Sequence, residues 1–138
     1  MKLILKLIVI GLLLMVAGCA NEPDITVRGV RFSSEHLSQG QQLYTQYCAS
    51  CHGANGEGQF PDAPNFPDET GRIGAPPHNG NGHTSHHSDE WLIQYIREGG
   101  ISLSNPASFY PMPAFGDQLS NEQIALVIAH IKTIWNEK

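Results

Sequence analysis

The chain has 138 residues, with 8 basic and 13 acidic side chains and a formal net charge of −5 at pH 7. Its length fits a single domain with an extension, and the lack of a basic stripe argues against nucleic acid as a partner. The 14 glycines and 9 prolines lie mostly in the middle of the chain. They predict few regular elements joined by long ordered loops, which need something to pack against.

The N-terminus has the layout of an export signal. Lys2 and Lys6 precede an apolar run from Leu7 to Ala17, and a run this short is a poor membrane span. The sequence VAGC at its end resembles a bacterial lipobox, in which the signal is cut before the cysteine and the cysteine is acylated. The resemblance implies a signal peptide over residues 1–18 and lipidation of Cys19. The alternatives are an ordinary signal peptide with a chance cysteine, and an uncleaved anchor helix.

A lipobox divides the chain into three parts. After the signal, residues 19–34 are expected to be a lipidated N-terminus and flexible tether, and residues 35–138 the folded domain. Cleavage also removes two of the 8 basic residues, so the mature chain is more acidic and favours partners with positively charged docking surfaces. We expect an exported protein that is lipid-anchored to a bacterial membrane, with its domain in the periplasm or otherwise outside the cytoplasmic membrane.

Residues 48–52 read CASCH, which is the attachment pattern of c-type haem. The thiols of Cys48 and Cys51 can each form a thioether to a haem vinyl group, and His52 then lies beside the iron as proximal ligand. A plain disulfide is possible in an oxidising compartment. A thioredoxin-like pair needs a βαβ context that this sequence does not show, and zinc needs two further ligands. The motif therefore predicts one covalent haem c.

With this motif in place, residues 35–137 resemble the class I cytochromes c, small helical proteins that carry electrons on one haem. The resemblance implies an all-α domain of about three helices, with long loops wrapped around the haem. It also implies transfer of single electrons rather than catalysis, with redox proteins or membrane redox complexes as donor and acceptor. An alternative is a haem-based sensor or catalyst in which the sixth iron ligand is labile.

The first helix of the domain is expected over Glu35–Tyr47, with Ser33 or Ser34 as its cap. Gly40 is a poor residue for a helix interior. In the family that this chain resembles, a glycine four residues before an aromatic residue lets the terminal helix approach closely. Gly40 and Tyr44 match that pair. We expect Gly40 to mark the helix crossing.

Two further helices follow from caps and periodicity. A middle helix is expected over Asp89–Glu98, between Ser88 as cap and a glycine pair. It is expected to turn Trp91, Leu92, Tyr95 and Ile96 toward the haem or the core. The last helix begins after Ser120, which forms a capping box with Gln123. Its apolar stripe comprises Ile124, Val127, Ile128, Ile131, Ile134 and Trp135. No stretch shows convincing strand alternation.

The resemblance implies a methionine from a distal loop as the sixth iron ligand. Met112 is the only methionine after Cys19, and it lies between Pro111 and Pro113, which fix the backbone on both sides. A packing role in the core is the alternative. In the family the proximal histidine donates to a proline carbonyl, and Pro64 is the best match for it, with Pro61 as runner-up.

The histidines offer further candidates. His78, His83, His86 and His87 fall in a loop rich in glycine and asparagine, and imidazole suits copper, zinc and nickel. We therefore expect either a speculative second metal site or a set of solvated loop residues. These four residues, with His36 and His130, are also rivals to the methionine as iron ligand. His130 is expected to pack against the first helix rather than bind iron.

Overall fold

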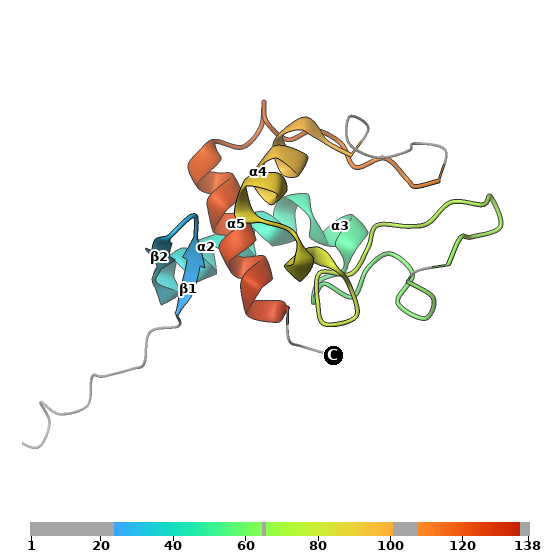
Figure 1. Cartoon of the computed structure of the whole chain (residues 1–138), viewed down its shortest axis with the longest axis horizontal. Coiled ribbons are helices and arrows are strands. Elements are labelled where there is room, and N and C mark those ends of the chain that lie inside the picture. The colour runs from blue at the N-terminus through green and yellow to red at the C-terminus, as the bar shows by residue number, and fades with distance from the viewer. Residues whose placement is uncertain (1–23, 65, 101–107, 136–138) are drawn as a thin grey trace, which may run out of the picture.

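A computed structural model of the chain describes residues 24–64, 66–100 and 108–135. Within these ranges two short strands precede four helices, so the predicted helical class of the domain is confirmed (Figure 1). The predicted signal peptide and Cys19 lie outside the described residues. No helix in the described ranges is long and apolar enough to span a membrane. The elements are β1 (Ile25–Val27), β2 (Val30–Phe32), α2 (Ser34–Tyr47), α3 (Ala49–His52), the 3-10 turn η2 (Thr84–His86), α4 (Asp89–Glu98) and α5 (Asn121–Ile134).

The packing of α2 against α5 forms the centre of the core. Ser33 caps α2 and Ser120 caps α5, each through its side-chain oxygen, which confirms the two predicted starts. At the crossing, a Cβ atom on Gly40 would lie 2.9 Å from the carbonyl carbon of Leu126 and would collide with its oxygen. Tyr44, one helical turn later, is fully buried. The expectation that Gly40 marks a close helix crossing is confirmed.

Helix α4 packs on α5 and has the predicted boundaries. The Ser88 hydroxyl accepts from the Trp91 amide at its start, and Gly99 ends it with a φ of 78°, a conformation that favours glycine. Leu92 and Ile96 are buried in the core, while Trp91 packs against it and stays partly exposed. Between α3 and α4 the chain makes the long loops that extend to one end of the molecule in Figure 1.

The structure corrects the predicted tether over residues 19–34. Residues 25–32 form an antiparallel hairpin in which Ile25 pairs with Phe32. Its turn contains Gly29 with a φ of 76°. The side chains of Val27 and Phe32 belong to the core cluster, and β1 packs on α5. The hairpin is therefore part of the folded domain. Sequence analysis missed it because strands of three residues are too short to show alternation.

A charged contact holds the hairpin on the helices. Lys132 Nζ of α5 lies 2.6 Å from Asp89 Oδ1 of α4 and donates to the Thr26 carbonyl at 2.6 Å. The second Asp89 oxygen accepts from the Arg28 amide at 2.7 Å. The side chains of Lys132 and Asp89 are only 14% and 18% exposed, so water screens this pair less than a surface pair. The contact joins β1, α4 and α5 at one point.

Candidate haem site

The CASCH motif forms a helical turn directly after α2. The amides of Cys51 and His52 both donate to the Cys48 carbonyl, at 3.1 and 2.9 Å, and α3 ends at Gly53 with a φ of 82°. Cys48 is buried and Cys51 exposed, and neither thiol is in a disulfide. Burial, with a smaller effect of Cys51, raises the pKa of the Cys48 thiol to about 12. Because neither cysteine is in a disulfide, both thiols can form thioether bonds.

The His52 side chain is held by a proline carbonyl. Its Nδ1 lies 2.8 Å from the Pro76 oxygen, and the residue is only 6% exposed. Burial lowers the pKa of His52, and the hydrogen bond to Pro76 partly opposes this. A neutral imidazole that donates its Nδ1 proton carries its lone pair on Nε2, which is the nitrogen then able to bind iron.

The prediction that Pro64 supplies this carbonyl, with Pro61 as runner-up, is wrong. The Gln59 amide donates to the Ala75 carbonyl at 3.0 Å, and the Ala75 amide donates to the Gln59 side chain at 3.0 Å. These bonds close a loop over residues 60–74, which includes both prolines. The chain returns to His52 only at Pro76. The sequence showed several prolines after the motif but not where this loop closes.

The next residues of this returning segment also pack at the site. The ring of His78 stacks on the ring of His52, with centroids 4.0 Å apart and planes at 20°. It also makes a T-shaped contact with Tyr44, with a centroid distance of 5.8 Å. Burial of the ring, with the nearby His52 as a second cause, lowers the pKa of His78 well below its ordinary value. The lowered pKa favours the neutral form of this half-buried ring.

The four loop histidines do not converge, so the predicted second metal site is wrong. His78 is half-buried and stacks on His52, whereas His86 is exposed. The rings of His83 and His87 are 5.3 Å apart, and His87 stacks on Trp91 at 3.8 Å. Among the residues that the structure describes, no three His, Cys, Asp or Glu side chains are placed to hold a metal ion. Aromatic stacking along α4 accounts for His87.

Met112 lies in the loop before α5 and is half-buried against the core. The end of α4 fixes this loop, because the Gly100 amide donates to the Met112 carbonyl at 2.9 Å and the Phe115 amide to the Ile96 carbonyl at 3.0 Å. A Cβ atom on Gly99 would lie 2.8 Å from the Met112 carbonyl oxygen, so only glycine permits this approach. The role of Met112 as iron ligand stays a prediction.

The donor set fits a covalent haem. Two thiols one helical turn apart and a histidine with a fixed tautomer are what haem c attachment requires. Two buried histidine nitrogens, His78 Nδ1 and His87 Nε2, have no hydrogen-bond partner among the described residues. A buried nitrogen of this kind costs about 1–3 kcal/mol unless it gains a partner. Haem propionates are acceptors that can supply one.

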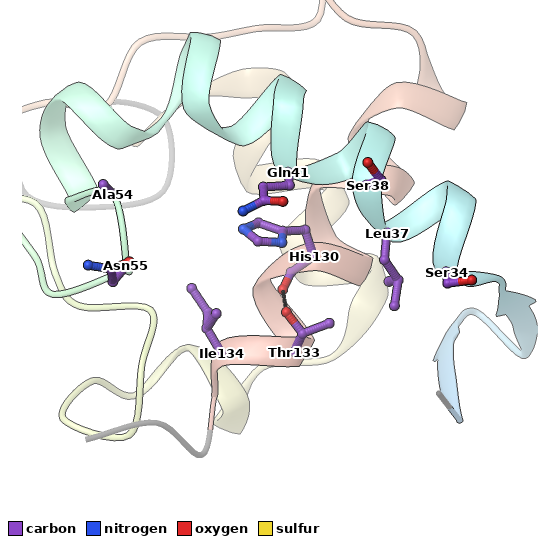
Figure 2. Close-up of a pocket in the computed structure, with 9 residues that line it drawn as sticks. All are labelled: Ser34, Leu37, Ser38, Gln41, Ala54, Asn55, His130, Thr133 and Ile134. Atoms are coloured by element: carbon purple, nitrogen blue, oxygen red, sulfur yellow. Dashed lines mark hydrogen bonds between the residues drawn. The ribbon is translucent and has the colours of Figure 1, made fainter. Parts of the chain in front are cut away.

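A separate pocket lies between α2 and α5 and reaches Ala54 and Asn55, just after the motif (Figure 2). It has a volume of about 470 Å³ and includes neither cysteine nor His52. His130 lines it and packs on Tyr44 of α2 with ring centroids 5.2 Å apart. This confirms the expectation that His130 packs against the first helix. The lining residues are Ser34, Leu37, Ser38, Gln41, Ala54, Asn55, His130, Thr133 and Ile134.

Comparison with known families decides the identity of the domain. Residues 35–131 match the family described as cytochrome c oxidase, cbb3-type, subunit III, and this match covers more than half of the chain. The chain belongs to this family. It is a monohaem c-type cytochrome that binds haem covalently, and Cys48, Cys51 and His52 fit the attachment motif.

A solved structure of another cytochrome shares the fold. Cytochrome cL from Hyphomicrobium denitrificans is 24% identical with a TM-score of 0.50, and the match covers 72% of this chain and 48% of that protein. This cytochrome thus spans about half the length of cytochrome cL. The c-type cytochrome XoxG from Methylobacterium extorquens AM1 is 19% identical with a TM-score of 0.46, covering 93% of this chain and 78% of that protein. A search of curated proteins finds no match.

Proposed function

We propose that this cytochrome carries single electrons between redox proteins. The observation that supports the proposal most is the 2.8 Å contact from His52 Nδ1 to Pro76, which leaves His52 Nε2 as the proximal iron ligand. We propose that Met112 would hold the iron together with His52. With both residues bound, the iron would keep no open site for a substrate, and the thioether would raise the reduction potential. The protein acts as a carrier rather than an enzyme.

The residues of the chain keep this ligand set rigid. Haem, when bound, would supply the one-electron chemistry between ferrous and ferric iron. The Pro76 carbonyl holds His52, while Pro111 and Pro113 restrict the backbone on both sides of Met112. The Gly100 amide holds the Met112 carbonyl against the end of α4. A rigid ligand set suits an electron carrier because little has to move when the charge changes.

We further propose that a lipid on Cys19 tethers this cytochrome to a bacterial membrane after export. Since the hairpin belongs to the domain, only residues 20–24 separate the lipid from β1. Five residues reach at most about 17 Å when extended. The hairpin and the long loops lie at opposite ends of the molecule in Figure 1, so the loop end points away from the tether. Its partners are membrane redox complexes or exported redox proteins with positively charged docking surfaces.

One preparation of the purified holoprotein tests the attachment of the haem. Denatured protein is extracted with acid acetone, and the absorption of the organic and aqueous phases is measured. Thioethers to Cys48 and Cys51 keep the haem on the protein. Quantitative loss of haem to the organic phase would contradict covalent attachment. Cys51→Ala leaves at most one thioether and is expected to impair maturation strongly.

Mass spectrometry of the mature protein tests the tether. The expected N-terminus is a lipid-modified Cys19, and Cys19→Ser should give an unlipidated precursor that is uncut or cut elsewhere. A mature wild-type protein with any other N-terminus contradicts the lipid anchor. The proposed electron transfer does not depend on this result.

A further inference from the structure

The proximal histidine has a second neighbour besides the proline carbonyl. The ring planes of His78 and His52 are within 20° of parallel at a centroid distance of 4.0 Å, which is a stacked arrangement. His78 also meets Tyr44 in a T-shaped arrangement, with the ring planes at 62°. Tyr44 is fully buried, and its hydroxyl donates to the Gly53 carbonyl at 2.9 Å, just after α3. His78 therefore contacts both His52 and a side chain that is itself fixed.

The backbone of His78 is also fixed. Its amide donates to the Gly56 carbonyl at 2.8 Å, and a Cβ atom on Gly56 would lie 3.2 Å from the His78 Cβ. The preceding residue, Pro77, is fully buried, and its carbonyl accepts from the Thr84 hydroxyl at 3.3 Å. The segment that brings the Pro76 carbonyl to His52 thus brings the stacking ring as well.

The two contacts restrict different motions of His52. A single hydrogen bond fixes the direction of Nδ1, but it allows the ring to tilt about the line from Nδ1 to the acceptor. A flat ring in van der Waals contact with the imidazole face blocks that tilt. The carbonyl therefore sets the tautomer, and the stacked ring sets the plane.

We propose that His78 is a positioning residue for the haem ligand and fixes the orientation of the His52 ring plane. The proposal rests on the proposed role of His52 as proximal ligand. It follows from the stacked geometry, so any flat ring of similar size at position 78 performs the same task. An aliphatic or small side chain does not.

Proton NMR of the ferric holoprotein tests this role. The spread and order of the haem methyl resonances depend on the orientation of the axial ligand planes. A substitution that only lowers stability leaves this pattern unchanged. His78→Ala should alter this pattern and speed exchange of the His52 Nδ1 proton with deuterium by about two- to tenfold, as the usual strength of an aromatic pair implies. His78→Phe, which keeps a flat ring, should restore the wild-type pattern.

His130→Ala is the matched control, because the His130 ring packs on the same Tyr44 but has its nearest ring contact there rather than on His52. It should lower stability and leave the methyl pattern unchanged. If His78→Ala gives no holoprotein, His78→Leu takes its place, because leucine fills the space without a flat ring. It should alter the methyl pattern in the same way.

The outcomes separate this proposal from the proposed function. An unchanged methyl pattern in His78→Ala, or in its Leu replacement, overturns the positioning role. A pattern that changes and is not restored by Phe overturns stacking as its cause. Wild-type protein without low-spin ferric haem contradicts the proposed ligand set itself, before any variant is compared.

Discussion

Gly40 of α2 lies directly against the backbone of Leu126 in α5. A Cβ atom at position 40 would be 2.9 Å from the Leu126 carbonyl carbon and 3.1 Å from the His130 Cβ. Two competing effects decide what happens when alanine replaces this glycine. Helix propensity favours alanine by about 1 kcal/mol, whereas forcing a methyl group into a packed crossing costs about 1–3 kcal/mol.

We expect the steric cost to prevail, because the neighbour is a backbone carbonyl that has no rotamer to change. Gly40→Ala should lower the free energy of unfolding of the holoprotein by up to about 2 kcal/mol, measured by denaturant titration. Gln42→Ala, at an exposed position of the same helix, should change it by less than about 0.5 kcal/mol. A Gly40→Ala protein more stable than wild type contradicts the close crossing.

A second prediction concerns the contact of Lys132 with Asp89 and Thr26 and its contribution to the free energy of unfolding. Lys132→Met keeps the stem of the side chain but leaves the poorly exposed Asp89 carboxylate without its cation. We expect a loss of about 1–3 kcal/mol, below the full cost of breaking a buried pair because both side chains retain some exposure. Limited proteolysis should also cut the hairpin faster.

The pair Arg31 and Asp24 provides the control for Lys132→Met. Their side chains lie 2.9 Å apart but are 65% and 77% exposed, so Arg31→Met should cost at most about 0.5 kcal/mol. Equal effects of the two substitutions would show that the hairpin is not held by the Lys132 contact.

Asp68 connects two loops and gives stability a pH dependence. Its carboxylate accepts from the Tyr110 hydroxyl at 2.6 Å and from the Thr70 hydroxyl at 2.7 Å. The bond from Tyr110, followed by that from Thr70, lowers the pKa of Asp68 from 3.8 to about 2. Because the folded-state pKa lies below the unfolded value, the stabilisation is present above about pH 4 and is lost as the pH falls toward 2.

Tyr110→Phe removes the strongest of these hydrogen bonds. The pKa of Asp68 should rise toward its ordinary value, and the loss of stability between about pH 4 and pH 2 should become smaller. NMR titration of the Asp68 carboxyl carbon checks the pKa directly. An Asp68 pKa that is the same in both proteins would mean that Tyr110 does not hold this carboxylate in solution.

Met112→His tests the sixth ligand. Imidazole is a harder donor than thioether and stabilises ferric relative to ferrous iron, so the reduction potential should fall. The weak absorption band at the red end of the ferric spectrum, which marks methionine ligation, should disappear. If wild-type ferric protein at neutral pH already lacks this band, a histidine or an open site is the better assignment.

The features that the sequence predicted well depend on local chemistry. The starts of α4 and α5 follow from Ser88 and Ser120, whose hydroxyls bond amides three residues later. The motif at residues 48–52 likewise lies within one helical turn. In each case the residues that make the contact are neighbours in the sequence, so spacing alone identifies them.

The features that were missed depend on where distant segments meet. Pro76 accepts from His52 because the chain closes a loop between Gln59 and Ala75, and no local pattern indicates that closure. The same return separates His78 from the other loop histidines, although they are close in sequence. The hairpin is stable through its packing on α5 and its contact with Lys132, not through a strand pattern of its own.

The reaction of the reduced protein with carbon monoxide tests the central claim most directly. If His52 and Met112 occupy both axial positions, the iron is closed, and the ferrous absorption spectrum at neutral pH should stay unchanged under the gas. Met112→Ala, with its sixth position open, should form the carbon monoxide complex and serves as the positive control. A wild-type spectrum that converts readily to that of the carbon monoxide complex would contradict the electron carrier and indicate a haem sensor or catalyst.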